Sequence, residues 1–246
     1  MTNQKTENTL FKTPFSCNYW KAAAGEFKKP QMLVTAAMLI ALRVALKSLA
    51  IPVGENLYIY IGFFVNALGA MIFGPVVATV AAAVSDTLGA LLFPTGAYFF
   101  PFIFVEMLGS FLFAVSLYRT KITSLRIILS RFLVSFFCNI VLNPIIMVYY
   151  YRIFYGKSYN LLNMARIIKN LALLPLESLL LIIFLRALIP VTNRMKLTYT
   201  GDEKISITKK SVIFLIVLTL IAVLSVVLYY VYRSGSFAAF FERFTK

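Results

Sequence analysis

Seven near-continuous apolar runs, most of them close to 20 residues long, constrain this chain more than any other feature of its sequence. A membrane-spanning helix needs about 20 apolar residues, whereas a membrane-spanning strand needs only about 10 and alternates in polarity. These runs do not alternate, and 61% of the chain is hydrophobic while 13% is charged. Soluble domains are about half apolar and about a quarter charged. The sequence therefore predicts an all-α integral membrane protein.

The runs define seven predicted spans, at about 31–50, 57–73, 75–92, 100–118, 127–151, 165–190 and 211–232. Gly74 and Pro75 indicate a tight turn between the second and third spans. Pro175 is expected to kink the sixth. The predicted organisation is an N-terminal arm (1–30), a six-span core (31–190), a polar linker (191–210), an additional transmembrane helix (211–233) and a tail (234–246).

The formal net charge of +15 is best explained by topology. Lysine and arginine flank the spans, and no basic segment is long enough to form a nucleic-acid-binding domain. Basic residues are denser before the first span and in the segments after the fourth and sixth. The positive-inside rule therefore predicts a cytoplasmic N-terminus. The segments 51–56, 93–101 and 152–163 would then face outward.

The N-terminal arm mixes aromatic and basic residues and lacks the apolar core of a signal peptide. Its aromatic residues are Phe11, Phe15, Tyr19 and Trp20, and its lysines include Lys12, Lys21, Lys28 and Lys29. Two interpretations fit this pattern equally well. One is a short amphipathic helix on the membrane surface, and the other is a disordered arm.

The sequence lacks the residues and motifs that several kinds of catalysis and metal binding require. There is no histidine, which removes the commonest metal ligand and general base. Cys17 and Cys138 lie in the arm and in a predicted span, so a disulfide framework is not expected. No phosphate-binding glycine loop and no nucleophile elbow occur. We expect no cofactor, no metal and no enzymatic activity, and uphill transport would need an ATPase on another subunit.

Asp86 is an acidic residue inside the third predicted span. A charge at the bilayer centre costs about 2.5–3.5 kcal/mol on insertion scales, so it usually faces a bundle interior or a polar cavity. The residues sharing its helical face are small: Thr79, Ala82, Ala83, Gly89 and Ala90. A neighbouring helix or a ligand can approach such a face closely.

Further polar residues follow helical spacing in the next three spans. The fourth holds Glu106 with Gly109 and Ser110, the fifth holds Arg131, Ser135, Asn139 and Asn143, and the sixth holds Arg166, Lys169, Asn170 and Glu177. One interpretation is a buried ligand site. The other is ion pairing within the bundle, for example between Asp86 and Arg43.

Two further patterns each have two interpretations. Ala37, Ala41 and Ala45 recur every four residues, which suits either a docking face for a membrane partner or helix packing within the bundle. The segment 93–101 is rich in aromatics between prolines, which suits a stiff lid over a flat ligand or an interfacial aromatic belt. For the tyrosines at 149–151 the belt is favoured.

These residues give the chain a resemblance to the substrate-binding S components of energy-coupling factor (ECF) vitamin transporters, and to the folate family among them. The central match runs from Gly74-Pro75 through Asp86 to Pro94-x-Gly96-x-Tyr98-Phe99. The other matching segments are 37–42, 67–73, 142–144 with 155–157, and 166–169 with Pro175. The match covers about 31–190, so the seventh span and the arm lie outside it.

The resemblance implies a six-helix bundle in a bacterial plasma membrane, with one extra C-terminal transmembrane helix in this chain. The vitamin is expected near the outer side, under the loops after the first, third and fifth spans. The bundle is expected to dock, through Ala37, Ala41 and Ala45, on a membrane coupling protein that works with two ATPase subunits. It is expected to topple in the membrane to release the vitamin inside.

The functional groups of folate match the polar residues of the predicted spans. A pterin ring presents an amino group beside a ring N–H, which a carboxylate can accept in bidentate fashion. The glutamate tail carries carboxylates that need basic partners. The expected ligand-binding residues are Lys47, Asp86, Tyr98, Phe99, Glu106, Asn139, Asn143, Arg166 and Lys169. The alternatives are an S component for another vitamin or precursor, and a membrane scaffold or intramembrane enzyme unrelated to transport.

Overall fold

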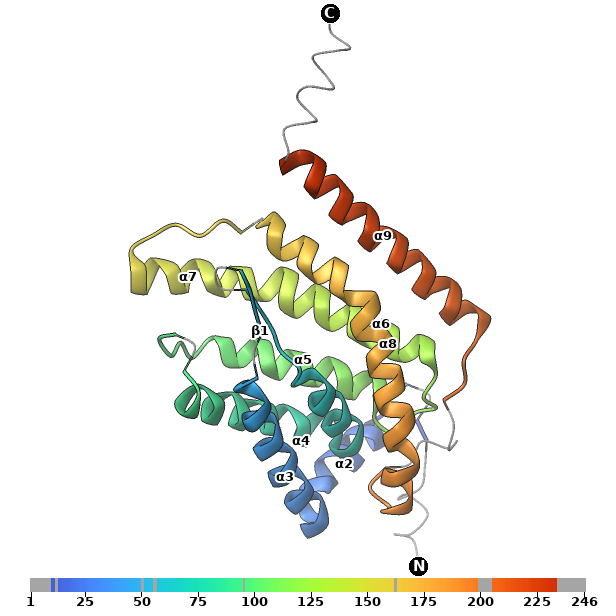
Figure 1. Cartoon of the computed structure of the whole chain (residues 1–246). Helices are drawn as coiled ribbons and strands as arrows, with labels where there is room; N and C mark the ends of the chain where they lie inside the picture. The colour runs from blue at the N-terminus through green and yellow to red at the C-terminus, as the bar shows by residue number, and fades with distance from the viewer. Residues whose placement is uncertain are drawn as a thin grey trace, which may run out of the picture.

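The computed structural model describes residues 10–11, 13–49, 51–54, 57–94, 96–161, 163–198 and 205–233. The predicted tail at 234–246 and parts of the arm and linker lie outside these residues. The helices are α2 (Cys17–Gly25), α3 (Pro30–Lys47), α4 (Phe63–Leu92), α5 (Phe102–Leu117), α6 (Ser124–Val134), α7 (Asn143–Tyr155), α8 (Met164–Arg194) and α9 (Lys209–Arg233). Figure 1 shows them as an elongated helical bundle.

The all-α membrane prediction is confirmed. Within the described residues, five helical segments are long and apolar enough to cross a membrane: Pro30–Lys47, Phe63–Leu92, Ser124–Tyr155, Met164–Arg194 and Lys209–Tyr230. Helix α5, the predicted fourth span, is a shorter apolar helix of 16 residues. Four of these five segments leave most of their residues unburied within the chain, as expected where lipid covers the outer faces, whereas Phe63–Leu92 is largely buried.

Helix α4 contains the turn that separates the second and third predicted spans. Its helical geometry breaks at Gly74, where φ is 74° and ψ is 177°. This conformation favours glycine, and a Cβ at this position would also lie 3.0 Å from the ring of Tyr118. The half of α4 before Gly74 is almost wholly buried. The half after Gly74 carries Asp86 and runs toward the segment 93–101.

The second predicted span begins later than expected. Residues 57–62 do not extend the helix, because strand β2 (Leu57–Ile59) pairs antiparallel with strand β1 (Ile51–Gly54). This short hairpin replaces the simple loop expected after the first span. The hairpin pairs backbone groups of the segment that connects α3 and α4. Such pairing leaves no side-chain periodicity by which the sequence could have revealed it.

The fifth predicted span has an irregular middle. Helices α6 and α7 are joined by the π-helical segment η2 (Ser135–Leu142), which carries Asn139. Pro144, at the start of α7, has no N–H to continue the α-helical ladder, and π-segments frequently occur at functional sites. Helix α8, in contrast, continues through Pro175 and Pro190 to Arg194.

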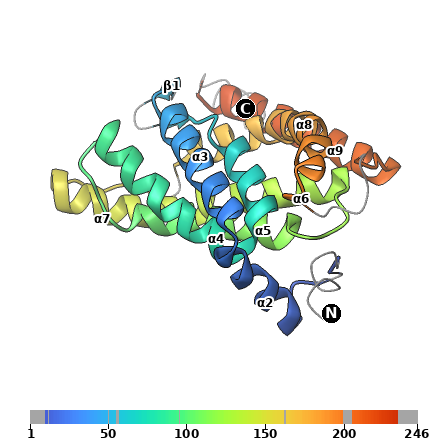
Figure 2. The same ribbon diagram turned by 90° about the horizontal axis from the view of Figure 1, so that it is seen from below.

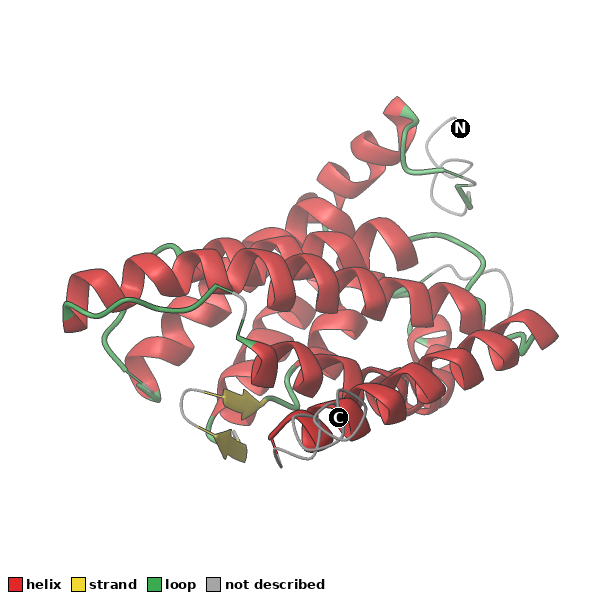
Figure 3. Cartoon of the chain, turned by 90° about the horizontal axis from the view of Figure 1, so that it is seen from above, coloured by secondary structure: helices red, strands yellow, loops and turns green. Residues whose placement is uncertain are grey.

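The main core lies where α4, α5, α6 and α8 meet, and includes Phe73, Phe113, Ile127 and Leu181, all at most 1% exposed. Helix α9 lies along α6 and α8, where Leu218 packs with Ile128 and Leu174. In the N-terminal part of the chain, α2 is followed by the short helix η1 (Glu26–Lys28), and α2 projects from the side of the bundle (Figures 2 and 3).

Candidate functional site

A cavity of about 370 Å³ lies between α3, both halves of α4, α5, the α6–α7 segment and α8. Its volume is in the range of sites for small organic ligands. All nine residues predicted to bind ligand line it: Lys47, Asp86, Tyr98, Phe99, Glu106, Asn139, Asn143, Arg166 and Lys169. Helical periodicity turns the charged and amide residues among them inward from five of the predicted spans, whereas Tyr98 and Phe99 lie between α4 and α5.

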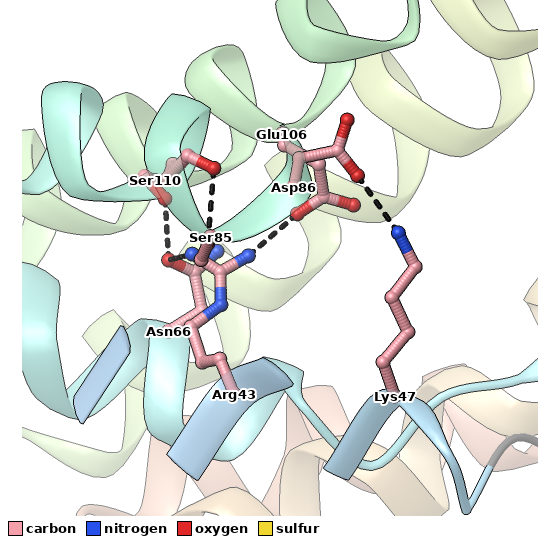
Figure 4. A network of polar contacts seen from close by, with 8 residues as sticks. Arg43, Lys47, Asn66, Ser85, Asp86, Glu106 and Ser110 are labelled. Atoms are coloured by element: carbon pink, nitrogen blue, oxygen red, sulfur yellow. Dashed lines mark hydrogen bonds and ion pairs between the residues drawn. The ribbon is translucent and has the colours of Figure 1, made fainter. Parts of the chain in front are cut away.

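Two ion pairs form the wall between α3, α4 and α5 (Figure 4). Lys47 Nζ lies 3.1 Å from Asp86 Oδ1, and Arg43 Nη2 lies 2.7 Å from Glu106 Oε2. Lys47 reaches Asp86 by crossing Gly89, where a Cβ would lie 2.7 Å from the lysine Cδ. Asp86 is thus ion-paired within the bundle, with Lys47 instead of Arg43.

The two carboxylates of this wall differ in accessibility. The Glu106 side chain is 42% exposed, whereas the Asp86 side chain is 14% exposed. Both line the cavity. Arg43 holds only one oxygen of Glu106 at hydrogen-bond distance, so the second oxygen is available to accept from a ligand. Glu106 is therefore the carboxylate that a bound molecule can reach most easily.

Asn66 completes this wall and was not among the predicted residues. Its side-chain oxygen accepts a hydrogen bond from Ser110 and lies 3.4 Å from Arg43 Nη1. Asn66 lies in the buried half of α4, before Gly74, and its amide holds the Arg43 guanidinium in place. The signal available in the sequence was a single amide in an otherwise apolar run.

The opposite wall is formed by α6, η2 and α8. Arg131 donates two hydrogen bonds to Glu177 Oε2, at 2.6 and 3.0 Å, and its guanidinium lies 4.4 Å from the ring centroid of Phe63. Asn139 donates to Asn170 at 2.9 Å. These contacts keep buried polar groups satisfied while leaving them at the cavity surface. Arg131 and Glu177 were recognised as polar positions but not selected as ligand residues.

Arg166 lies in the first turn of α8, where Asn163 caps the helix. Its side chain donates to Asn143 and lies over the ring of Tyr159, at 5.6 Å from the centroid. Arg166 is only 6% exposed, and its buried Nε has no hydrogen-bond partner among the described residues. A buried N–H without a partner is costly, so this guanidinium is suited to receive an anionic group from a ligand.

The cavity lining carries more positive than negative formal charge. Its basic residues are Arg43, Lys47, Arg131, Arg166 and Lys169, and its acidic residues are Asp86, Glu106 and Glu177. Each of the three carboxylates is in an ion pair. Five basic and three acidic residues leave the described lining with a formal excess of two positive charges. This excess is complementary to a ligand that carries two negative charges.

The segment 93–101 is fastened to α7 by Tyr150. The Ala97 N–H donates to the Tyr150 hydroxyl at 3.1 Å, and a Cβ at Gly96 would lie 2.8 Å from the same oxygen. The Tyr150 ring also contacts Phe99 and Phe102. Tyr150 is buried and lines the cavity, so its assignment to an interfacial belt was wrong, whereas the neighbouring Tyr149 is exposed.

The alanine ridge lies on the outside of α3. Ala37, Ala41 and Ala45 are all exposed, whereas Ala36 and Val44 on the other side of the helix are buried. The ridge therefore does not serve packing among the described residues of this chain. It presents a flat strip that a second membrane protein can approach closely.

Comparisons with known proteins agree with this architecture. The family described as "ECF-type riboflavin transporter, S component" matches residues 28–189. "Folate transporter FolT" of Clostridium novyi is 28% identical over 154 residues, which cover 63% of this chain and 87% of that protein. "Folate transporter FolT" of Leuconostoc mesenteroides is 31% identical over 150 residues, which cover 60% and 80%.

A solved structure has the same fold. The structure described as "Crystal structure of FolT bound with folic acid" superposes with a TM-score of 0.55 at 28% identity, covering 61% of this chain and 88% of that one. Helix α9 lies beyond the segment matched by the family.

Proposed function

Because the chain belongs to the S components of energy-coupling factor transporters, and among them to the folate transporter group, we propose that its cavity binds folate for uptake. The chain is a multi-pass membrane protein of a transporter family. The observation that carries the folate assignment is the excess of two positive charges in the cavity lining. Folate carries two carboxylates on its glutamate tail and matches this excess.

The pterin end suits the carboxylate wall. Glu106 has one oxygen held by Arg43 and a second oxygen available to the amino group and ring N–H of a pterin. Asp86 is the alternative acceptor, although Lys47 already holds one of its oxygens. Asn139, across the cavity, offers an amide to the remaining ring edge.

The glutamate tail suits the N-terminal end of α8. Arg166 offers its buried Nε, and Lys169 lies one turn further along the same helix and also lines the cavity. Asn143 supports the Arg166 guanidinium. The aromatic loop would cover the ligand, with Tyr98 and Phe99 as stacking surfaces and Tyr150 holding the loop in place.

Riboflavin is the second candidate, because the matching family carries that vitamin in its description. Riboflavin is neutral and would leave both excess positive charges of the lining uncompensated in a low-dielectric site. Burying uncompensated charge is unfavourable. The charge of the lining therefore favours folate over riboflavin.

The energy for uptake would come from partner subunits. We assign the exposed ridge of Ala37, Ala41 and Ala45 to docking on the membrane coupling protein of an ECF module with two ATPases. The distribution of lysine and arginine supports a cytoplasmic N-terminus and a cavity that opens outward.

A panel of vitamins in a thermal-shift assay tests the proposal. A ligand at about 100 times its Kd stabilises the native state by about 2.7 kcal/mol. Folate should raise the unfolding temperature of the purified protein more than riboflavin, thiamine or biotin. A larger shift with riboflavin than with folate would overturn the ligand assignment while leaving the transporter family unchanged.

A further inference from the structure

The N-terminal helix α2 is fixed to the bundle by its inner face. Tyr19 and Ala23, one turn apart, are both fully buried. The Tyr19 hydroxyl donates to the carbonyl of Ala114 at 3.3 Å, and its ring meets Tyr118 edge to face. Ahead of the helix, the Phe11 N–H donates to the carbonyl of Arg119 at 2.9 Å. The described part of the arm is therefore a docked helix, in contrast to the disordered alternative.

The carboxylate of Glu26 is withdrawn from the surface. It is the one acidic residue in the described part of the arm, and it is only 1% exposed. Arg119 Nη2 lies 2.8 Å from it, Tyr118 donates to the same oxygen at 2.8 Å, and Lys29 lies 3.3 Å from the other oxygen. Arg119 adopts a left-handed backbone conformation, with φ of 46°, in making this contact. The exposed charges of α2 and η1 are consequently all positive.

The outward side of α2, η1 and the residues just before α2 combines aromatic rings and lysines. Phe15 is 90% exposed, and Trp20 and Phe27 are about one-third to two-fifths exposed. Lys21 and Lys28 are exposed beside them. We call these five residues the arm face. Aromatic rings together with lysines are typical of helices that lie in the headgroup layer of a bilayer. Trp20 is also stacked on Phe111 of α5, so the face is held against the membrane-embedded bundle.

The arm face lies at the end of the bundle away from the cavity. Its supporting contacts are with Ala114, Tyr118 and Arg119 at the C-terminal end of α5, and none of these three lines the cavity, which α5 lines from Phe102 to Phe113. An α-helix of 16 residues is about 24 Å long. Figure 2 shows α2 projecting below the bundle near the N-terminus.

We propose that the arm face binds anionic phospholipids at the membrane surface opposite the cavity. Lysines attract anionic headgroups, and the rings of Phe15, Trp20 and Phe27 insert among the lipids at the interface. The occupant is lipid and not a protein, because the face combines positive charge with interfacial aromatics and adjoins helices that themselves cross the bilayer. The proposal does not depend on the identity of the vitamin.

The single tryptophan of the chain makes the test direct, because Trp20 lies on the arm face. The full chain is reconstituted in vesicles, and the fluorescence of Trp20 is quenched by phospholipids brominated near the headgroup. Brominated phosphatidylglycerol should quench Trp20 more strongly than brominated phosphatidylcholine at the same mole fraction. Bromines deep in the acyl chains should quench it less than bromines near the headgroup.

Two matched double variants give the control. Lys21→Gln with Lys28→Gln should remove the difference between the two lipids, whereas Lys209→Gln with Lys210→Gln, on exposed lysines of α9, should preserve it. Equal quenching by both lipids in the unmodified protein would overturn the proposal. So would an arm variant that keeps the difference. Trp20 fluorescence that no brominated lipid quenches would show that the arm face does not contact lipid and would also overturn it.

Discussion

Glu106 accepts a 2.7 Å hydrogen bond from Arg43 on one oxygen, yet 42% of its side chain remains exposed at the cavity. The guanidinium orients the carboxylate through one oxygen, and the second oxygen is left to accept from a ligand. This arrangement makes Glu106 a pre-oriented acceptor for a flat donor edge such as that of a pterin.

Replacing Glu106 with glutamine should weaken folate binding about 10- to 100-fold, because hydrogen bonds to charged groups contribute about 1.5–3 kcal/mol. The measurement is equilibrium titration of purified protein. Glu177→Gln is the matched control: Arg131 donates twice to Glu177 and the side chain is largely buried. It should lower thermal stability more than affinity. Equal losses of affinity in both variants would refute a specific role for Glu106.

Lys47 and Asp86 should behave as a coupled pair in unfolding measurements. Each single change, Lys47→Met or Asp86→Leu, leaves a partly buried charge without its partner and should lower the free energy of unfolding. The double variant should recover most of that loss. The coupling energy is expected to be about 1–2 kcal/mol, because both side chains are partly accessible to solvent. Simple additivity of the two losses would show that the ion pair does not contribute to stability.

Arg166→Gln should lower the affinity for folate but not the affinity for pteroic acid. Folate should bind about 10- to 100-fold more weakly, because its tail loses a charge-assisted partner. Pteroic acid, which lacks the glutamate, should bind with nearly unchanged affinity, and this also verifies that the variant folds. Arg152→Gln, at an exposed position on α7, should affect neither ligand. A comparable loss of affinity for folate and for pteroic acid would show that Arg166 does not bind the glutamate tail.

Tyr150→Phe should release the loop at 93–101 without opening the core. The variant keeps the ring contacts with Phe99 and Phe102 but loses the hydroxyl that accepts from the Ala97 N–H. Ligand dissociation in stopped-flow measurements should become several-fold faster, since a neutral hydrogen bond contributes about 1 kcal/mol, while association changes little. Tyr149→Phe, at the exposed neighbour, is the control and should leave both rates unchanged. Unaltered dissociation in Tyr150→Phe would show that this contact does not hold the loop.

The sequence was sufficient to predict most of the polar residues that meet in the cavity, although not Asn66. Helical spacing turns Asp86, Glu106, Asn139 and Arg166 toward the interior, and lipid on the outside leaves few other places for such residues. The pairing among them was not predictable. Asp86 meets Lys47 and not Arg43 because the choice depends on how α3 crosses α4 and on the space left by Gly89, neither of which periodicity specifies.

Other features depend on contacts between distant segments. Tyr150 follows an exposed tyrosine and precedes a partly buried one, so only the position of the loop at 93–101 reveals that it faces inward. The burial of Glu26 depends on Arg119, more than 90 residues away in the sequence. The hairpin β1–β2 and the π-helical segment η2 likewise arise from backbone pairing and a proline position, which leave no hydrophobic period.

We propose above all that the cavity selects a dianionic pterin ligand through its excess of positive charge. Calorimetric titration of the purified, full-length protein with folate, pteroic acid and riboflavin tests it most directly. We expect a Kd for folate below about 1 µM, corresponding to about −8 kcal/mol, with weaker binding of pteroic acid and no measurable binding of riboflavin. Tight binding of neutral riboflavin, with folate weaker or absent, would contradict it.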